Sequence, residues 1–403
     1  MKLAELPPLS LYIHIPWCLR KCPYCDFNSH EQRDDVPERQ YVEALVADLE
    51  SVLPNVWGRR LSTIFIGGGT PSLFTPQAID HLLTAVRTRI PVDPSAEITM
   101  EANPGTFERD RFQGYRDAGV NRLSVGVQSF DDARLAAIGR VHGADEARRA
   151  LEAALAIYPT VNADLMYALP GQDLGGALRD VHEAIALGVP HVSAYHLTLE
   201  PDTNFHRFPP QLPDEDAAAD MQDAIERDLA GAGYGHYETS AFARPGQRAR
   251  HNLNYWTFGD YIGIGAGAHA KISLPDRILR EQRQRKPATY MRGASQGNAI
   301  DETRVVSDAE LPFEFMLNAL RLVDGFALDL FTQRTGLPVT AITAQLDRAQ
   351  QEGLVERTHA HVRPTPRGRR FLNELMQRFL PAQAKRARTI PISTCSPGTS
   401  RPS

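Results

Sequence analysis

The feature that most constrains the fold is an alternation, repeated six times from residue 11 onward, between short β-rich runs and segments with helical periodicity. Such alternation is typical of parallel α/β sheets, because a connection between parallel strands usually contains a helix. The predicted strands are Leu11–Ile15, Ser62–Ile66, Glu97–Glu101, Arg122–Val127, Val161–Tyr167 and Val192–Leu197. Six units are fewer than a closed eightfold barrel requires, so we expect a partial (βα)6 barrel with functional groups at the carboxyl ends of its strands.

The pattern changes twice after this barrel, which we expect to span residues 1–235. A glycine- and aromatic-rich stretch, residues 236–300, is expected to extend the sheet or to cover its open side. Residues 301–380 return to helical periodicity around a short β-like pair, which predicts a winged-helix-like α+β domain. Residues 381–403 contain basic but no acidic side chains and many Pro, Ser and Thr residues, so we expect a disordered basic tail.

Composition excludes several classes of protein. The formal net charge of -5 gives no overall field that would attract nucleic acid or anionic lipid, although local membrane contact stays open. The first ten residues lack the apolar run of a signal peptide, and no stretch of about 18 apolar residues predicts a transmembrane helix. Three of the 4 cysteines are clustered, which is unlike a secreted disulfide framework. We therefore expect a cytoplasmic protein with a metal site.

The clustered cysteines form a C-x3-C-x2-C loop, with Cys18, Cys22 and Cys25 directly after the first predicted strand. Three thiolates can hold a [4Fe–4S] cluster and leave one iron with an open coordination position. The alternative is a zinc site, in which His14 or His30 would supply a fourth ligand. Both interpretations place a metal at the carboxyl end of the first strand.

Later strands also end in glycine or polar residues. The run GGGTPS, residues 67–72, suits a place where the backbone approaches a ligand closely or adopts positive φ. Glu101, Gln128 and Asp164 offer hydrogen-bond acceptors near three further strand ends, and Arg140 offers a planar cation for a carboxylate. Each could instead serve a local turn, helix cap or surface ion pair. Together they predict one binding site at the mouth of the barrel.

This cysteine loop, followed one βα unit later by the glycine run, resembles the radical S-adenosylmethionine (SAM) superfamily. The resemblance implies that the open iron chelates SAM and that an electron donor drives its cleavage into methionine and a 5′-deoxyadenosyl radical. It assigns no catalytic residue to this chain. It implies SAM contacts at Tyr12, Tyr24, Gly68, Gly69, Thr70, Glu101, Gln128, Arg140, Asp164 and Ala194.

Within the superfamily, residues 10–375 are similar to the HemW family, described as oxygen-independent coproporphyrinogen III oxidase-like proteins and as heme chaperones. The phrases that carry the similarity are LYIHIPWC, YCDFNSH, GGGTPS, EANPGT, RLSVGVQSF, DLMYALPGQ and HNLNYW. The resemblance implies that HNLNYW binds heme. Our hypothesis is that His251 is the axial ligand and that Tyr255 and Trp256 cover the macrocycle. His251 could instead only staple this segment to the barrel, and His269 is a rival ligand.

We therefore expect a heme chaperone that delivers heme to apo-hemoproteins such as respiratory enzymes, with an electron donor as a further partner and a homodimer left open. The alternative is an oxygen-independent coproporphyrinogen III oxidase, which converts propionates to vinyl groups. Against it, Phe27 occupies the position of a further cysteine in that enzyme, and its long N-terminal extension is not expected here. The expected enzymatic activity is at most SAM cleavage.

A nucleic-acid regulator ranks last. Its support is a local basic cluster in the winged-helix-like domain, formed by Arg363, Arg367, Arg369 and Arg370. A short basic cluster in acidic surroundings is more often a solvated face or a protein contact.

Overall fold

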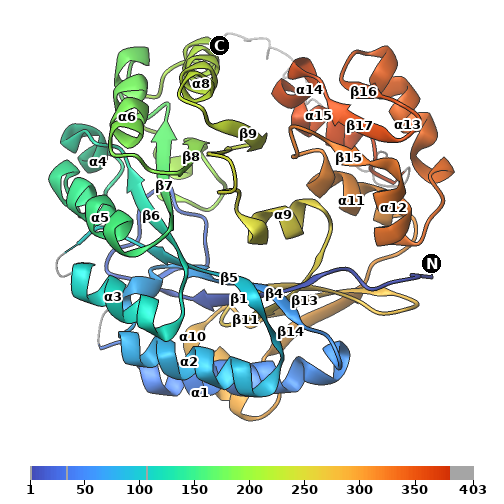
Figure 1. The fold of residues 1–403 in the computed structure, drawn as a ribbon, viewed down its shortest axis with the longest axis horizontal. Coiled ribbons are helices and arrows are strands. Elements are labelled where there is room, and N and C mark those ends of the chain that lie inside the picture. Colours follow the sequence, from blue (N-terminus) through green and yellow to red (C-terminus); the bar gives the residue numbers. More distant parts are fainter. Residues whose placement is uncertain (1, 33–34, 106–107, 382–403) are drawn as a thin grey trace, which may run out of the picture.

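The computed structural model describes residues 2–32, 35–105 and 108–381, and within them one twelve-stranded sheet forms the frame of the molecule (Figure 1). Six parallel strands follow chain order at its centre: β1 (Leu9–Ile15), β4 (Leu61–Gly68), β5 (Val92–Ala102), β6 (Arg122–Gln128), β7 (Thr160–Tyr167) and β8 (His191–His196). They coincide with the six predicted strands. The partial-barrel prediction is confirmed, because the sheet ends at β14 (Ile300–Val305) on one side and β9 (Gly235–Glu238) on the other.

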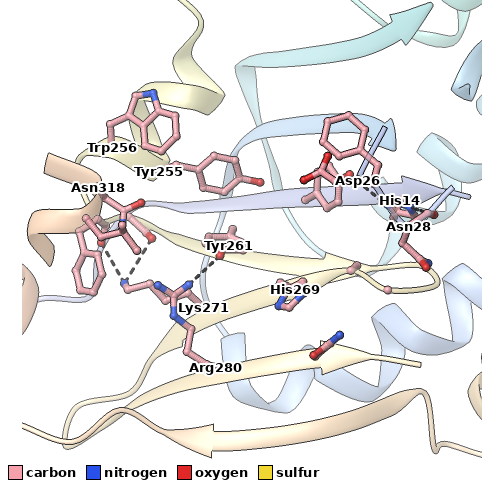
Figure 2. A pocket seen from close by; sticks show the side chains of 18 of the residues that line it. His14, Asp26, Asn28, Tyr255, Trp256, Tyr261, His269, Lys271, Arg280 and Asn318 are labelled. Carbon is pink, nitrogen blue, oxygen red and sulfur yellow. Dashed lines mark hydrogen bonds between the residues drawn. The ribbon is translucent and has the colours of Figure 1, made fainter. Parts of the chain in front are cut away.

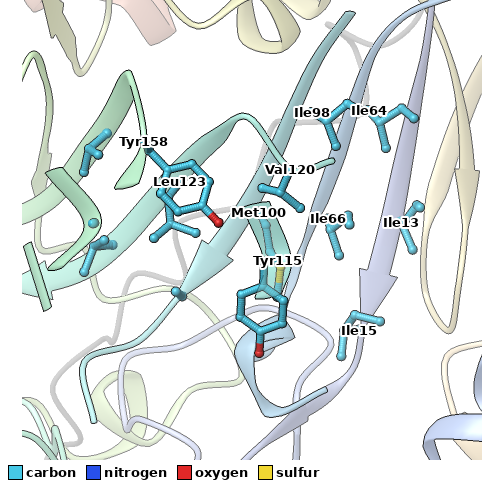
Figure 3. Packing of buried hydrophobic residues seen from close by; sticks show 14 of the residues in the cluster. Ile13, Ile15, Ile64, Ile66, Ile98, Met100, Tyr115, Val120, Leu123 and Tyr158 are labelled. Carbon is cyan, nitrogen blue, oxygen red and sulfur yellow. The ribbon is translucent and has the colours of Figure 1, made fainter. Parts of the chain in front are cut away.

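Alternation along each central strand separates the hydrophobic core from the functional side. Successive side chains of a strand point to opposite faces of the sheet. On β1 and its neighbours, Ile13, Ile66 and Met100 face the core, where they pack near Tyr115 and Tyr158 (Figure 3). The residues between them point to the inner face of the partial barrel, so the polar positions of these strands share one concave side.

Amphipathic helices cover the outer face of the sheet (Figure 1). The helix α1 buries Val42, Leu45, Leu49 and Val52, the stripe that helical spacing predicts. The covering helices are α1 (Glu38–Val52), α2 (Pro76–Arg89), α3 (Glu108–Ala118), α5 (Ala144–Ile157), α6 (Leu174–Ala186) and α8 (Glu215–Gly231). The short helices α4 (Asp132–Ala137) and α7 (Asn204–Arg207) lie in connections.

The stretch after α8 extends the sheet at both ends. The strand β11 (Asp260–Ile264) pairs in parallel with β1, and β12 (His269–Ser273), β13 (Ile278–Arg283) and β14 continue antiparallel. At the other end, β10 (Ala241–Ala243) and β9 add to β8. The HNLNYW segment forms α9 (Arg250–Trp256), which contacts β1, β4 and β11, and α10 (Pro287–Ser295) packs on α1.

The C-terminal part of the described chain has its own hydrophobic core, which includes Phe315, Phe331, Leu346 and Val362. Five helices and a three-stranded sheet form this winged-helix-like part. Its elements are α11 (Leu311–Ala319), β15 (Phe326–Ala327), α12 (Leu328–Thr335), α13 (Thr340–Gln351), β16 (Val355–Arg357), β17 (His361–Pro364), α14 (Pro366–Arg370) and α15 (Leu372–Gln377).

The predicted domain boundaries fall at the start of β9, between residues 235 and 236, and inside β14, between residues 300 and 301. The division into these units stays a prediction. Of the predicted tail, residues 382–403 lie outside the described part of the chain. None of the described helices has the length and apolar composition needed to cross a membrane.

Candidate functional site

The cysteine loop is closed by backbone pairing and by one lysine. After β1, the two-residue strand β2 (Trp17–Cys18) pairs in parallel with β3 (His30–Glu31), which joins the two ends of the loop. Inside the loop, Nζ of Lys21 donates hydrogen bonds to the carbonyl oxygens of Phe27 and Ser29, at 3.1 and 3.2 Å. The loop is therefore a defined structure at the carboxyl end of β1.

The thiols of Cys18, Cys22 and Cys25 are free and partly buried. Burial raises the pKa of the Cys18 thiol, although a hydrogen bond with Thr70 opposes the change. Nη1 of Arg140 lies 3.8 Å from Sγ of Cys22 and can donate to it. A thiol that resists ionisation when free still binds iron as a thiolate, because the metal displaces the proton. Three such thiols, with a cation beside them, are a donor set that suits an iron–sulfur cluster.

The two histidines considered for a zinc site differ in their surroundings. His14 is engaged at both ring nitrogens, because Nδ1 lies 2.9 Å from the hydroxyl of Tyr12 and Nε2 lies 3.0 Å from the carbonyl oxygen of Asn28. His14 would have to give up one of these bonds to reach a metal. Nε2 of His30 is buried without a hydrogen-bond partner among the described residues. The zinc alternative therefore depends on His30.

The glycine run brings the end of β4 against the cysteine loop. A Cβ atom at Gly69 would lie 2.5 Å from the carbonyl oxygen of Trp17 and 3.1 Å from Sγ of Cys18. Gly68 has a φ of +116°, which disfavours any side chain, and its Cβ would meet the ring of His14. Backbone bonds fix this contact, including one of 2.7 Å from the amide of Thr70 to the carbonyl of Trp17. The backbone of the glycine run thus closely approaches the start of the cysteine loop.

A cavity of about 330 Å³ opens between this loop and the strand ends. All three cysteines line it, together with eight of the ten residues predicted to contact SAM. The eight are Tyr24, Gly68, Gly69, Thr70, Glu101, Gln128, Arg140 and Asp164. The other two lie elsewhere: Tyr12 lines a neighbouring cavity, and Ala194 is buried in β8, where its amide donates to the carbonyl oxygen of Ser240.

Two partly buried carboxyl groups face this cavity. Burial and, to a smaller extent, the charge of Asp164 raise the pKa of Glu101 to about 8, although Oε2 accepts a 3.0 Å hydrogen bond from the amide of Gly68. Burial also raises the pKa of Asp164, against hydrogen bonds of 2.9 and 2.8 Å from Ser124 and Asn162. A cationic ligand would favour the ionised form of both groups.

Arg140 is held at the cavity with one donor unused. Its Nη2 donates hydrogen bonds of 2.7 Å to Oδ1 of Asn103 and to the carbonyl oxygen of Gly126. Its Nε is buried and has no hydrogen-bond partner among the described residues. A buried donor of this kind is costly unless a ligand satisfies it.

Gln128 ends β6 with a φ of +69°, a strained conformation for a residue with a side chain.

Sequence reasoning missed Asn103, which joins two of the predicted residues. Its Oδ1 accepts from Arg140, and its Nδ2 donates to Oγ1 of Thr70 at 2.9 Å. The signal was its place two residues after Glu101, at the end of β5. Ser124 and Asn162 were also missed, because they lie inside strands rather than at their ends.

A second cavity, of about 630 Å³, adjoins the first (Figure 2). Asp26 and Phe27 line both cavities. Of the residues predicted to bind heme, Tyr255 and Trp256 line the larger cavity, and so does the rival ligand His269. These side chains come from α9 and β12.

His251 is not among the residues that line this cavity and is buried, with 1% of its surface exposed. Its Nδ1 lies 2.7 Å from Oγ1 of Thr63 and its Nε2 lies 2.9 Å from the hydroxyl of Tyr255. Burial lowers the pKa of His251 to about 3, so the ring is neutral. Its assignment as a heme ligand stays a prediction, and in this conformation both ring nitrogens are engaged.

Two family models match the chain: the Radical SAM superfamily at residues 12–182 and the HemN C-terminal domain at residues 306–371. Heme chaperone HemW of Escherichia coli (strain K12) is 50% identical over 94% of this chain and 100% of its own length. The chain belongs to the HemW family. Heme chaperone HemW of Haemophilus influenzae is 45% identical over 94% of the chain and 99% of that protein. The predicted resemblance to HemW is confirmed.

Among solved structures, the chain is similar to coproporphyrinogen III oxidase (HemN) from Escherichia coli, a radical SAM enzyme. The TM-score is 0.79 at 24% identity, and the match covers 93% of this chain and 90% of that chain. This similarity shows that the chain and HemN share a fold.

Proposed function

We propose that this chain is a heme chaperone, which binds heme and delivers it to apo-hemoproteins. The observation that carries the proposal is the 50% identity to Escherichia coli heme chaperone HemW along the whole of that protein. Because the match leaves out no part of the relative, it extends over both the barrel and the C-terminal domain. The cavity of about 630 Å³, with its aromatic lining, offers room for a flat apolar ligand.

The proposal includes two resident cofactors, a [4Fe–4S] cluster on Cys18, Cys22 and Cys25, and SAM in the cavity of about 330 Å³. When bound, the reduced cluster supplies the electron that cleaves SAM. The chain's own residues bind and orient: Glu101 and Asp164 accept hydrogen bonds from cationic or hydroxyl groups, and the unused Nε of Arg140 suits a carboxylate. The donor set and this unsatisfied buried atom support the assignment.

Coproporphyrinogen III oxidase activity is the second candidate, because the fold is shared with HemN. Similarity at 24% identity supports the fold and does not extend to the reaction. Phe27, at the position where the resemblance expects the oxidase's further cysteine, is 58% exposed and lies between the two cavities. The chaperone is therefore the better supported function.

Three arginines of the basic cluster considered for nucleic-acid binding form ion pairs with acidic side chains. Nη2 of Arg363 lies 2.6 Å from Glu356, Arg369 lies 3.7 Å from Glu226, and Arg370 pairs with Asp223. Nη1 of Arg367 donates to the carbonyl oxygen of Glu352 at 3.0 Å. These contacts favour a protein surface over a phosphate-binding surface.

The expected setting is the cytoplasm, with respiratory apo-hemoproteins and an electron donor as partners.

The test begins with anaerobic reconstitution with iron and sulfide. The protein is then titrated with heme while the Soret band is followed, and the complex is mixed with an apo-hemoprotein. We expect stoichiometric heme binding and transfer, with no vinyl product from coproporphyrinogen III in a parallel assay. A protein that binds no heme, or that forms vinyl product with SAM, would overturn the proposal.

A further inference from the structure

The cavity of about 630 Å³ has the features of a built ligand site, within the range of about 300–1,000 Å³ that such sites occupy. Its floor is the extended edge of the sheet, where Tyr261, Lys271 and Arg280 lie side by side on β11, β12 and β13. Tyr255 and Trp256 of α9 form an aromatic wall (Figure 2). Aromatic walls of this kind cover apolar macrocycles.

His269 presents an unengaged imidazole to this cavity. It is the first residue of β12, and strand alternation places its side chain on the same face as that of Lys271. The side chain is exposed, and its ring makes no hydrogen bond with any other residue that the structure describes. Partial burial lowers the pKa of His269, with Arg280 and Arg285 adding to the effect. The neutral imidazole is the form that ligates iron.

His251 has a different role in this geometry. Its bond to Thr63 on β4 holds α9 against the sheet, and its bond to Tyr255 lies within the helix. The other histidine at the cavity, His14, is also engaged at both nitrogens. His251 is therefore a positioning residue, which fixes the hydroxyl end of Tyr255 in the cavity wall.

Among the described residues that line the cavity, the guanidinium of Arg285 is the cation that stays available. Lys271 is paired with Asp260, and Arg280 donates to Tyr261 at 2.8 Å and to Glu314 at 2.5 Å. Arg285 is exposed at the cavity, and its backbone is fixed because its carbonyl oxygen accepts a 2.8 Å hydrogen bond from Asn28. No ion pair engages its guanidinium among the described residues. A bound carboxylate would pair with it.

We propose that this cavity is the heme site, that His269 is the axial ligand of the iron, and that Arg285 binds a propionate. The proposal rests on the proposed function, because it assumes that the cargo is heme. It assigns the aromatic part of HNLNYW to the cavity wall and its histidine to the support of that wall.

The ligand is tested with the reconstituted protein and its His269→Ala and His251→Ala variants. Each is titrated with heme and with metal-free protoporphyrin IX, and the iron coordination is followed by electron paramagnetic resonance. We expect His269→Ala to lose heme affinity at least tenfold and to change the iron spectrum, while protoporphyrin IX binds as in the wild type. His251→Ala should retain the wild-type iron spectrum and melt at a lower temperature.

An unchanged heme spectrum and affinity in His269→Ala would overturn the assignment, as would loss of the spectrum in a folded His251→Ala protein. Heme binding by the wild type distinguishes a failure of the proposed function from a failure of this inference. If the wild type binds no heme, the proposed function fails with this inference. If it binds heme and His269→Ala binds it identically, only this inference fails.

The propionate contact is tested with Arg285→Gln, against Lys286→Gln as a matched control outside the cavity lining. Heme and heme dimethyl ester, which lacks free carboxylates, are the two probes. We expect Arg285→Gln to weaken heme binding several-fold without changing the affinity for the ester, and Lys286→Gln to change neither. Equal affinities of wild type and Arg285→Gln for heme would overturn the assignment of Arg285.

Discussion

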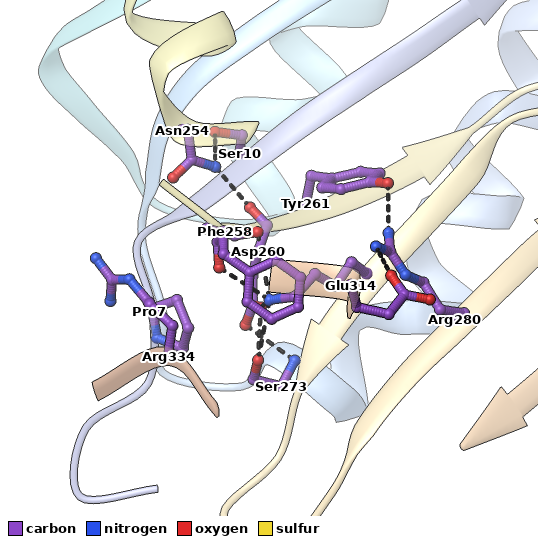
Figure 4. A network of polar contacts seen from close by, with 12 residues as sticks. Pro7, Ser10, Asn254, Phe258, Asp260, Tyr261, Ser273, Arg280, Glu314 and Arg334 are labelled. Carbon is purple, nitrogen blue, oxygen red and sulfur yellow. Dashed lines mark hydrogen bonds and ion pairs between the residues drawn. The ribbon is translucent and has the colours of Figure 1, made fainter. Parts of the chain in front are cut away.

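Nζ of Lys271 lies 2.8 Å from Oδ1 of Asp260, and neither side chain is more than 1% exposed (Figure 4). Lys271 also donates to the carbonyl oxygen of Phe258 at 3.0 Å, and Oδ2 of Asp260 lies 2.8 Å from Arg59. Burial lowers the pKa of Lys271 to about 8. Burial acts to raise the pKa of Asp260, but Lys271 and Arg59 outweigh it and hold that pKa below its usual value. The pair joins β11 to β12 at the start of the sheet extension.

Removing the lysine should be costly. Lys271→Met removes one of the two ion pairs of the buried Asp260 carboxylate and leaves the pair with Arg59, and breaking a buried pair costs about 3–5 kcal/mol. Denaturant unfolding should show a loss of this size. The control is Arg39→Met, which breaks an exposed pair with Glu43 on α1 and should cost no more than about 0.5 kcal/mol. Equal losses in the two variants would contradict the structural role of the buried pair.

The three loop cysteines should be required for iron. Alanine at Cys18, Cys22 or Cys25 removes one of the three thiolates, so each variant should retain little iron and sulfide after anaerobic reconstitution. Cys395, outside the described residues, is the control, and Cys395→Ala should match the wild type. Full iron content in any of the three loop variants would refute the assignment of that cysteine.

Gly69 should tolerate no side chain. Its Cβ would meet the carbonyl oxygen of Trp17 at 2.5 Å, so Gly69→Ala should push the cysteine loop away from β4 and lower the iron bound after reconstitution. Gly231, at the end of α8, has open space where a Cβ would stand. Gly231→Ala should therefore leave iron content and stability near those of the wild type. Similar iron content in both variants would count against a tight contact at Gly69.

Glu101 should make the stability of the apo-protein depend on pH. Its pKa is raised from about 4.5 to about 8 in the folded chain, so the folded state holds a proton that the unfolded state has released. Stability from this group is present below pH 4.5 and falls as pH rises to about 8, by up to about 1.4 kcal/mol for each pH unit.

The measurement compares Glu101→Gln with the wild type by denaturant unfolding at pH 5.5 and pH 8.5. Glutamine does not titrate, so the variant should gain stability relative to the wild type at the higher pH. Parallel pH profiles would show that Glu101 has an ordinary pKa.

The central strands and most of the cofactor cavity could be predicted because their signals are local. Alternation locates the strands, and the carboxyl ends of parallel strands meet at one rim, which brings Glu101, Arg140 and Asp164 together. The engagement of His251 could not be predicted, since its partner Thr63 lies 188 residues away in the chain. The pairing of β11 with β1 depends equally on a distant return of the chain.

Asp26 and Phe27 form a shared boundary, since each lines both the cavity at the cysteines and the larger cavity beside α9. A ligand that displaces the ring of Phe27 in one cavity should change the shape of the other, because the same side chain lines both. We therefore expect a ligand in either cavity to affect the other through the side chains of Asp26 and Phe27.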